Sequence, residues 1–496
     1  MSKHLLRRTA FGAGLIFLMN SLSLAVSFIF YIVASRILSP WEVGSVSLLL
    51  MVISIFNTLT MLALNSAVIK YVSESLGSGR IGGASSAFWS CMRLVSIIAV
   101  PSYLFTVASA GRLASLTGGL DAPSILLATT SGLILDYTSI IGGAFYGLML
   151  YGQVAIQNII FMVVGRFSAL VLAWLGFRVY GVALGVVVGA LACLFYSAIA
   201  FRGRLKGYGF IRSRILLDYS TPIYLFNVIG LAQGWLDVAI LYGLTSDLST
   251  VGVYYLVVSS TTVLMALPNS FASILFPTMS FRLGESGLEG VREVLENSIH
   301  LTVLVMAPLC LALASAAPTA LTIAYGSAYK VGSSALRVAA LAAFPSALYT
   351  IMNSALQAVG YTRPMALAGL ASVIVDLVTL TLAVPAYSGV GAALARVTMA
   401  LAGLTVAYKS LRSRVNFKFS LDWRLLAYAA STSTPILTIE KFGFDTMVGG
   451  LLEILTFTAV STIMFKILKP INTFEKRILE DVTPNRLKPI IKFIIH

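Results

Sequence analysis

The sequence is poor in charge, cysteine and histidine. Only 11% of its 496 residues are charged and 58% are apolar, whereas a soluble protein carries about a quarter charged residues. All three cysteines fall inside apolar runs and the three histidines are scattered, so neither a disulfide framework nor a metal cluster is expected. The sequence has no G-x-x-x-x-G-K-[ST] motif, so we expect no nucleotide hydrolysis and no cofactor. The cysteines and histidines of the sequence are Cys91, Cys193, Cys310, His4, His300 and His496.

Long apolar segments follow one another almost without interruption. A membrane-spanning helix needs roughly 20 mostly apolar residues, and the chain supplies about 14 such segments with no loop long enough for a soluble domain. The first segment, residues 11–34, is longer than the roughly 7 to 15 apolar residues of a cleaved signal peptide, so it is predicted to be an uncleaved helix. The second is predicted to run from residue 43 to residue 69. The fold class predicted is therefore an all-α polytopic membrane protein with about 14 transmembrane helices.

The net charge of +15 is distributed in alternate loops. Loops rich in Lys and Arg stay on the inner side of a membrane. This pattern predicts a multi-pass protein of the plasma membrane with both termini in the cytoplasm. Because the charge alternates with the helices, it indicates topology, and nucleic-acid binding is not expected. Six Lys and Arg are predicted to be outer (Arg36, Arg112, Arg178, Lys330, Arg337, Lys441), three to lie within helices (Arg93, Arg166, Arg396), and the other 25 of the 34 to be inner.

A basic segment divides the sequence. Residues 202–214 carry five positive charges and no acid, with long apolar runs on both sides. We predict an N-terminal lobe of six helices, a basic cytoplasmic hinge, a C-terminal lobe of six helices, two further helices and a basic cytoplasmic tail. The boundaries are 1–201, 202–220, 221–411, 412–468 and 469–496.

A weak internal repeat relates the two lobes. Val43-Gly44 and Val251-Gly252 are separated by 208 residues, and Gly181-Val182 and Gly389-Val390 by the same interval. Chance agreement in an apolar sequence is the alternative explanation. Because six helices is an even number, both lobes would enter the membrane from the same side, which predicts a parallel repeat.

Several turn and packing motifs resemble a known family in their order and spacing. They are R-I-L-S-P-W-E-V-G at 36–44, K-Y-V-S-E at 70–74, Y-G-S-A-Y at 325–329, L-Q-A-V-G-Y-T-R at 356–363 and V-P-A-Y-S-G-V-G-A-A at 384–393. Over nearly the whole chain the sequence resembles the Wzx-type flippases of the multidrug, oligosaccharidyl-lipid and polysaccharide exporter superfamily. The resemblance implies two six-helix lobes around a central cavity that opens alternately to each side, plus two C-terminal helices. It implies a transporter and not an enzyme, with a polyprenyl-linked oligosaccharide and membrane lipids as partners.

Charged residues within the helices are the candidate site residues. Each costs roughly 2.5 to 3.5 kcal/mol at the membrane centre, so it needs a partner or a wet cavity. Helix length places Arg166, Asp136 and Asp376 near mid-depth. We expect Arg166 to meet the pyrophosphate or an acidic sugar of the substrate, and Asp376 or Asp136 to hold Arg166 when the cavity is empty. A static buried ion pair or triad is the alternative.

Three more charged residues lie away from mid-depth. Asp237 and Arg396 fall in the predicted outer third and Arg93 in the inner third. The first two are predicted to line the cavity or to form an outer gate between the lobes. Arg93 is likewise predicted to belong to a gate or to the cavity, and the alternative is that its head group simply extends to the inner interface.

Other functions remain as alternatives. A cation-coupled drug exporter of the same superfamily would be expected to carry a carboxylate on helix one, and residues 11–34 contain none. A lipid II flippase would be expected to have cavity arginines on helices one and two, which are lacking here. A multispan glycosyltransferase or polymer ligase would need a large outer loop, and every predicted outer loop is short. The energy source stays open between a proton gradient, a sodium gradient and consumption of the glycan outside.

Overall fold

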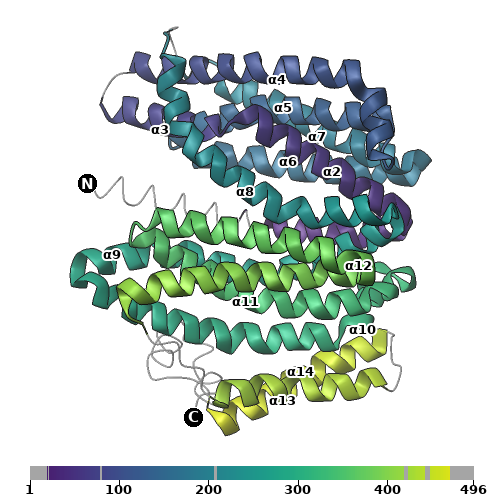
Figure 1. Ribbon diagram of the computed structural model, residues 1–496. Coiled ribbons are helices and arrows are strands. Elements are labelled where there is room, and N and C mark those ends of the chain that lie inside the picture. The colour runs from purple at the N-terminus through teal and green to yellow at the C-terminus, as the bar shows by residue number, and fades with distance from the viewer. Residues whose placement is uncertain are drawn as a thin grey trace. The chain divides into compact units, whose positions relative to one another are not determined.

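The computed structural model describes residue 19 and residues 22–78, 81–205, 209–417, 423–441 and 447–469. Helices dominate these residues (Figure 1). The chain divides into two compact units, Met1–Gly252 and Val253–His496. Of the predicted hinge, residues 206–208 lie outside the described residues, as does the predicted tail after Lys469. The lobe boundaries inferred from the sequence remain predictions.

The first unit is a helical bundle centred on α5. An apolar helix over Leu22–Ile37 precedes α2 (Pro40–Met61), α3 (Leu64–Gly77), α4 (Ile81–Thr117), α5 (Ala122–Gly147), α6 (Tyr151–Leu172), the π-helical turn η1 (Ala173–Phe177), α7 (Arg178–Phe201) and α8 (Ser213–Thr245). Helix α5 packs against α2, α3, α4, α6 and α7. Its buried Ile140 and Phe145 join Leu64, Phe88 and Leu216 in one apolar core. Burial of such side chains is the main source of cohesion between the helices, at roughly 25 cal/mol per Å².

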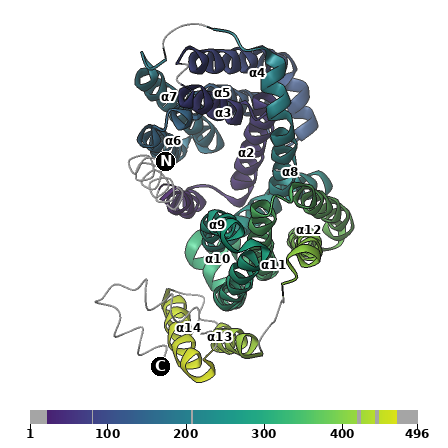
Figure 2. The same cartoon turned by 90° about the vertical axis from the view of Figure 1, so that its left-hand side faces the viewer.

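The second unit contains the remaining helices. These are α9 (Leu248–Ser315), of which Leu248–Gly252 belongs to the first unit, α10 (Ala317–Tyr325), the 3-10 turn η2 (Ser327–Gly332), α11 (Ser333–Ala358), α12 (Thr362–Val415), α13 (Trp423–Lys441) and α14 (Met447–Leu468). Helix α11 runs along α12, and α13 runs along α14 (Figures 1 and 2). The core includes Met279, Leu295, Ile351 and Leu356, all fully buried. Each unit therefore has an apolar core of its own.

Three of the long helices are broken by residues in the left-handed region. The 68 residues of α9 would reach about 100 Å as one helix, far more than the roughly 30 Å of hydrocarbon in a bilayer. Breaks occur at Gly287 in α9 (φ 66°), at Ser388 in α12 (φ 48°) and at Gly176 before α7 (φ 101°). In the described part of the chain, nine helices are long and apolar enough to span. Counting each broken helix as two gives twelve segments, and the shorter Leu22–Ile37 helix and the less apolar α13 bring the candidate segments to fourteen. The predicted all-α polytopic class is confirmed, and the number of crossings remains a prediction.

The outward faces of the helices are apolar. Phe105, Phe167, Trp174 and Phe195 in the first unit, and Leu382 in the second, are each more than two-thirds exposed. Water would not tolerate so many exposed large hydrophobic side chains on one monomer, but the acyl chains of a bilayer would. The protein is thus a multi-pass membrane protein.

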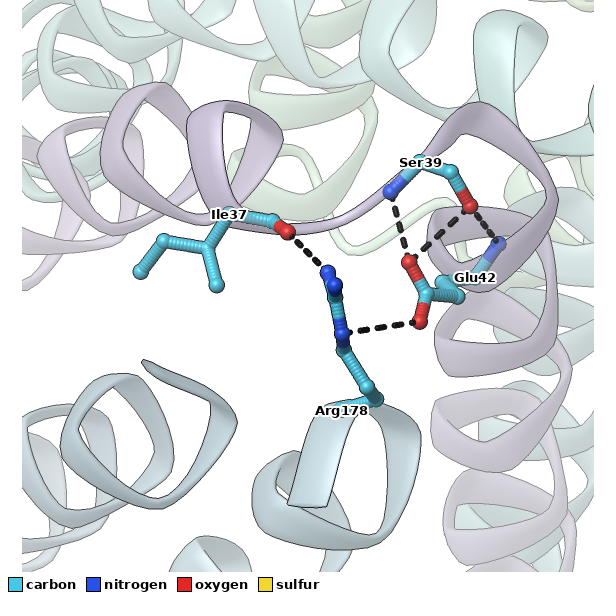
Figure 3. Close-up of polar contacts among 4 residues, drawn as sticks. All are labelled: Ile37, Ser39, Glu42 and Arg178. Carbon is cyan, nitrogen blue, oxygen red and sulfur yellow. Dashed lines mark hydrogen bonds and ion pairs between the residues drawn. The ribbon is translucent and has the colours of Figure 1, made fainter. Parts of the chain in front are cut away.

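The start of α2 is held by a compact polar network (Figure 3). Ser39 is the N-cap, its hydroxyl accepts a hydrogen bond from the backbone N–H of Glu42, and Glu42 Oε2 accepts from the backbone N–H of Ser39 at 2.7 Å. Arg178, at the start of α7, donates to the carbonyl of Ile37 at 2.6 Å and lies 3.7 Å from Glu42 Oε1. One arginine therefore joins the end of the Leu22–Ile37 helix to the starts of α2 and α7.

We expect two substitutions of Glu42 to differ in their effect on stability. Glu42→Ala removes the reciprocal cap and should cost about 1 kcal/mol. Glu42→Gln keeps a hydrogen-bond acceptor at the same place and loses only the ion pair, which is worth about 0 to 1 kcal/mol because the Arg178 side chain is 55% exposed. Thermal unfolding of the two purified variants in detergent measures the difference, and equal melting temperatures would contradict the capping role.

Two glycines of the internal repeat meet in a reciprocal contact within the first unit. A Cβ atom on Gly44 would lie 2.0 Å from the carbonyl oxygen of Leu248, and one on Gly252 would lie 1.9 Å from the carbonyl oxygen of Pro40. Leu248 follows Pro40 by the same 208 residues that separate the two glycines. Gly44 of the first repeat meets Leu248 of the second, and Gly252 of the second meets Pro40 of the first. A contact in which equivalent residues exchange partners in this way has two-fold character. This contact supports the repeat and requires glycine at both places.

Candidate functional site

Arg166 lies on α6 with its charge against aromatic rings. Its guanidinium carbon is 4.4 Å from the ring centroid of Phe30 and 5.4 Å from that of Tyr31, both on the Leu22–Ile37 helix. Phe30 is buried, whereas Arg166 is half-buried. Among the residues that the structure describes, Arg166 forms no ion pair with a carboxylate. A cation–π contact thus holds its position, and no described residue accepts a hydrogen bond from its guanidinium.

Asp136 lies on α5 and is fully buried. Its Oδ1 accepts a hydrogen bond from Asn57 Nδ2 at 2.7 Å, and its Oδ2 is 2.5 Å from Thr60 Oγ1; both partners are on α2. The expected pairing of Asp136 with Arg166 is therefore not formed. Two neutral side chains of α2 satisfy the carboxyl instead, and Arg166 rests on Phe30 and Tyr31.

The helix next to Asp136 is interrupted. Leu62 and Ala63 both have positive φ, at 45° and 56°, and they separate α2 from α3. The prediction of one continuous helix over residues 43–69 was wrong. Left-handed backbone costs roughly 1 to 2 kcal/mol for each residue with a Cβ atom, so the surrounding packing must hold this break.

A cavity of about 210 Å³ with both polar and apolar walls lies beside the break, within the first unit. The buried Gln157 on its wall donates to the carbonyl of Thr138 at 2.8 Å. Leu135, next to Asp136 in sequence, also lines the cavity, whereas Asp136 itself does not. The other polar walls of the cavity are Asn65, Ser139, Tyr146 and Asn158. Polar walls of this kind can hold water.

In the second unit, Asp376 and Arg396 lie in the two halves of α12. Asp376 is buried, and Arg396 donates from Nε to the hydroxyl of the buried Tyr254 at 3.1 Å. The hydroxyls of Thr379 and Thr398 are 2.9 Å apart and join the same two halves. These contacts fix the backbone around both charged groups. The role of Asp376 in a substrate cavity remains a prediction.

Asp237 and Arg93 belong to the first unit. Asp237 on α8 is buried and accepts a hydrogen bond from the backbone N–H of Val238. Arg93 on α4 is exposed, and its guanidinium carbon is 5.5 Å from the ring centroid of Phe210. Since Asp237 and Arg396 are in different units, the gate that the sequence suggested also remains a prediction.

One buried carboxyl was missed by the sequence analysis. Glu453 on α14 is buried and accepts a hydrogen bond from the hydroxyl of Thr319 on α10 at 2.8 Å. One turn earlier, a Cβ atom on Gly450 would lie 2.4 Å from the side chain of Ile323. The hydrogen bond of Glu453 and the close approach at Gly450 therefore hold α14 against α10. Glu453 is a lone acid in an apolar run, as Asp376 is, so the same sequence signal could have identified it.

Comparison with known proteins agrees with this architecture. The family described as "Polysaccharide biosynthesis protein" matches residues 33–334. The chain is 24% identical over 389 residues to the "Probable low-salt glycan biosynthesis flippase Agl15" of Haloferax volcanii, covering 78% of this chain and 79% of that protein.

Solved structures show the same fold. The lipid II flippase MurJ in an inward closed conformation matches with a TM-score of 0.69 and 14% identity, covering 92% of this chain and 99% of MurJ. An inward-facing MATE multidrug transporter of the MOP superfamily matches with a TM-score of 0.62 and 15% identity, covering 78% and 94%. At such identities the likeness establishes the fold alone. The match to the family, however, spans well over half of the sequence and confirms the resemblance that its motifs indicated: the chain belongs to the polysaccharide biosynthesis protein family.

Proposed function

We propose that this protein flips a lipid-linked oligosaccharide from the cytoplasmic to the outer leaflet by alternating access, without making or breaking covalent bonds. One observation carries the proposal. Arg166 places a cation inside the membrane, held by Phe30 and Tyr31, with no carboxylate paired to it among the described residues. Intramembrane cations are expensive and usually serve a function. A guanidinium fork with open donors suits the phosphates or acidic sugars of such a substrate.

The comparisons support this substrate class. One relative is named as a probable glycan biosynthesis flippase, and the fold is that of a lipid II flippase. The distribution of Lys and Arg favours the plasma membrane with both termini in the cytoplasm. Asp376 is proposed as a second cavity residue, and Asp237, Arg396 and Arg93 as residues of the gate or the cavity walls.

A cation-coupled multidrug exporter is the second candidate, because the fold also matches that of a MATE transporter. Arg166 argues against an exporter of cationic drugs, since a cation in the pathway would repel a cationic substrate. Coupling to a proton or a sodium ion is compatible with either candidate.

A depletion strain tests the proposed function. When the protein is depleted from its native cells, lipid-linked oligosaccharide should accumulate on the inner leaflet, and restoring the protein should clear it. Altered drug sensitivity without that accumulation would favour the exporter and contradict the flippase.

A further inference from the structure

The hydroxyl of Thr60 lies close to two oxygen atoms. Its Oγ1 is 2.7 Å from the carbonyl oxygen of Phe56 and 2.5 Å from Oδ2 of Asp136. A hydroxyl carries one hydrogen, and a carbonyl can only accept. If Thr60 donates to Phe56, the short contact with Asp136 is a hydrogen bond only when Asp136 is protonated and donates to Thr60.

The charge balance around Asp136 favours the protonated form. An ionised carboxylate buried without a cation is strongly unfavourable. The titratable side chains on α5 and on the helices packed against it are Glu42, Lys70, Tyr71, Glu74, Cys91, Arg93, Tyr103, Arg112, Tyr137, Tyr146, Tyr151, Arg166, Arg178, Tyr180, Cys193 and Tyr196. In the described part of the chain, none of them forms an ion pair or hydrogen bond with Asp136.

The nearest cations are engaged elsewhere. Arg178 lies beside Glu42, Lys70 lies over the rings of Tyr71 and Tyr219, Arg93 faces Phe210, and Arg166 rests on Phe30. Four of the five cations on α3, α4, α6 and α7 therefore have contacts of their own, and the fifth, Arg112, forms no ion pair among the described residues. Only the neutral side chains of Asn57 and Thr60 remain to stabilise the carboxyl of Asp136.

The orientation of the Asn57 side-chain amide shows whether Asp136 binds a proton or a metal cation in this arrangement. Its Nδ2 is 2.7 Å from Asp136 Oδ1 and 2.8 Å from the carbonyl oxygen of Gly132. A group facing two acceptors must be the NH₂ and not the amide oxygen. A sodium ion at Asp136 would need oxygen ligands where this NH₂ lies, whereas a proton on Oδ2 leaves every polar atom of the cluster with a partner.

We propose that Asp136 is the proton-binding residue of the transport cycle, protonated in the conformation described here. The proton leaves Oδ2 for water in the cavity beside Leu135, and the carboxylate then needs the Thr60 hydroxyl as a donor. Thr60 must turn away from Phe56, two residues before the break at Leu62 and Ala63. The loss of the proton is thereby linked to the break between α2 and α3. This proposal rests on the proposed transport function for its role, but its chemistry can be measured separately.

Infrared spectroscopy of the full chain in lipid vesicles tests the protonation. A neutral carboxyl has a C=O stretch at higher frequency than a carboxylate. At neutral pH the difference spectrum of wild type minus Asp136→Asn should contain such a band, which separates Asp136 from the other buried carboxyls, Asp237, Asp376 and Glu453. Asp247→Asn, which alters an exposed acid in the turn between α8 and α9, should keep the band. Identical spectra for wild type and Asp136→Asn at every pH would overturn the proposal.

Two further variants keep the test decisive if Asp136→Asn does not fold. Thr60→Val removes the acceptor of the carboxyl proton and should shift the band, whereas Thr60→Ser should leave it in place. An unshifted band in Thr60→Val would contradict the assigned hydrogen bond.

A transport measurement in the same vesicles tests coupling. An inward proton gradient should speed outward movement of a polyprenyl-linked oligosaccharide by wild type, and Asp136→Asn should lose that stimulation. Movement that ignores the gradient in wild type would overturn the coupling while leaving the flippase function intact. Absence of movement in all vesicles would count against the flippase function, and the infrared band would still decide whether Asp136 carries a proton.

Discussion

Replacing Gly44 with alanine is expected to destabilise the protein by about 3 kcal/mol or more, at the upper end of what overpacking costs. The added Cβ atom would lie 2.0 Å from the carbonyl oxygen of Leu248 and 2.8 Å from its carbonyl carbon. Both atoms belong to the backbone, so no side chain can move aside. Gly252→Ala should have a similar effect, because its Cβ atom would meet the carbonyl oxygen of Pro40 at 1.9 Å.

Gly243→Ala in α8 is the matched control. No atom lies within 4 Å of the Cβ position of Gly243. Alanine is favoured over glycine in a helix by about 1 kcal/mol, so this variant should be neutral or slightly stabilised. Thermal unfolding and the yield of folded protein in detergent measure all three variants. Gly44→Ala with wild-type stability would show that the contact with Leu248 is looser than described.

Replacing Arg166 with alanine is expected to reduce flipping by roughly 10- to 150-fold, which corresponds to the 1.5 to 3 kcal/mol of a hydrogen bond to a charged group. The variant should still fold, because Arg166 has no ion pair among the described residues and loses only a cation–π contact of about 1 kcal/mol. Export of glycan by the depletion strain carrying the variant measures the effect, with membrane levels of the protein as the reference.

Two companion variants separate charge from geometry at Arg166. Arg166→Lys keeps the charge but not the planar fork, so it should retain part of the activity. Phe30→Leu removes the ring beneath the guanidinium and leaves the charge, so its effect on export should be smaller than that of Arg166→Ala. Full export by Arg166→Ala at normal protein levels would remove Arg166 from the substrate pathway.

The fold class could be predicted from the sequence because the bilayer imposes a simple rule on it. Each crossing needs a long apolar run, and these runs were visible in the sequence. The break at Leu62 and Ala63 could not be predicted. Neither residue favours positive φ, and nothing local marks the end of α2.

Candidate site residues were equally visible, but their partners were not. A charge stands out in an apolar run, which is how Asp136 and Arg166 were chosen. The bond between Asn57 and Asp136 joins residues 79 positions apart. Which face of α2 turns toward α5 depends on tertiary packing, and no local pattern records it. The sequence therefore suggested an acid holding Arg166, whereas rings of the Leu22–Ile37 helix do so.

Movement of a lipid-linked oligosaccharide in vesicles that contain only this protein tests the proposed function most directly. A polyprenyl-pyrophosphate oligosaccharide is placed in both leaflets, and a membrane-impermeant reagent reports the sugars that reach the outside. Wild-type vesicles should expose nearly all of the glycan, whereas protein-free vesicles should expose only the glycan that began in the outer leaflet. Arg166→Ala vesicles should expose the remaining glycan roughly 10- to 150-fold more slowly than wild type. Equal exposure in wild-type and protein-free vesicles would contradict the account.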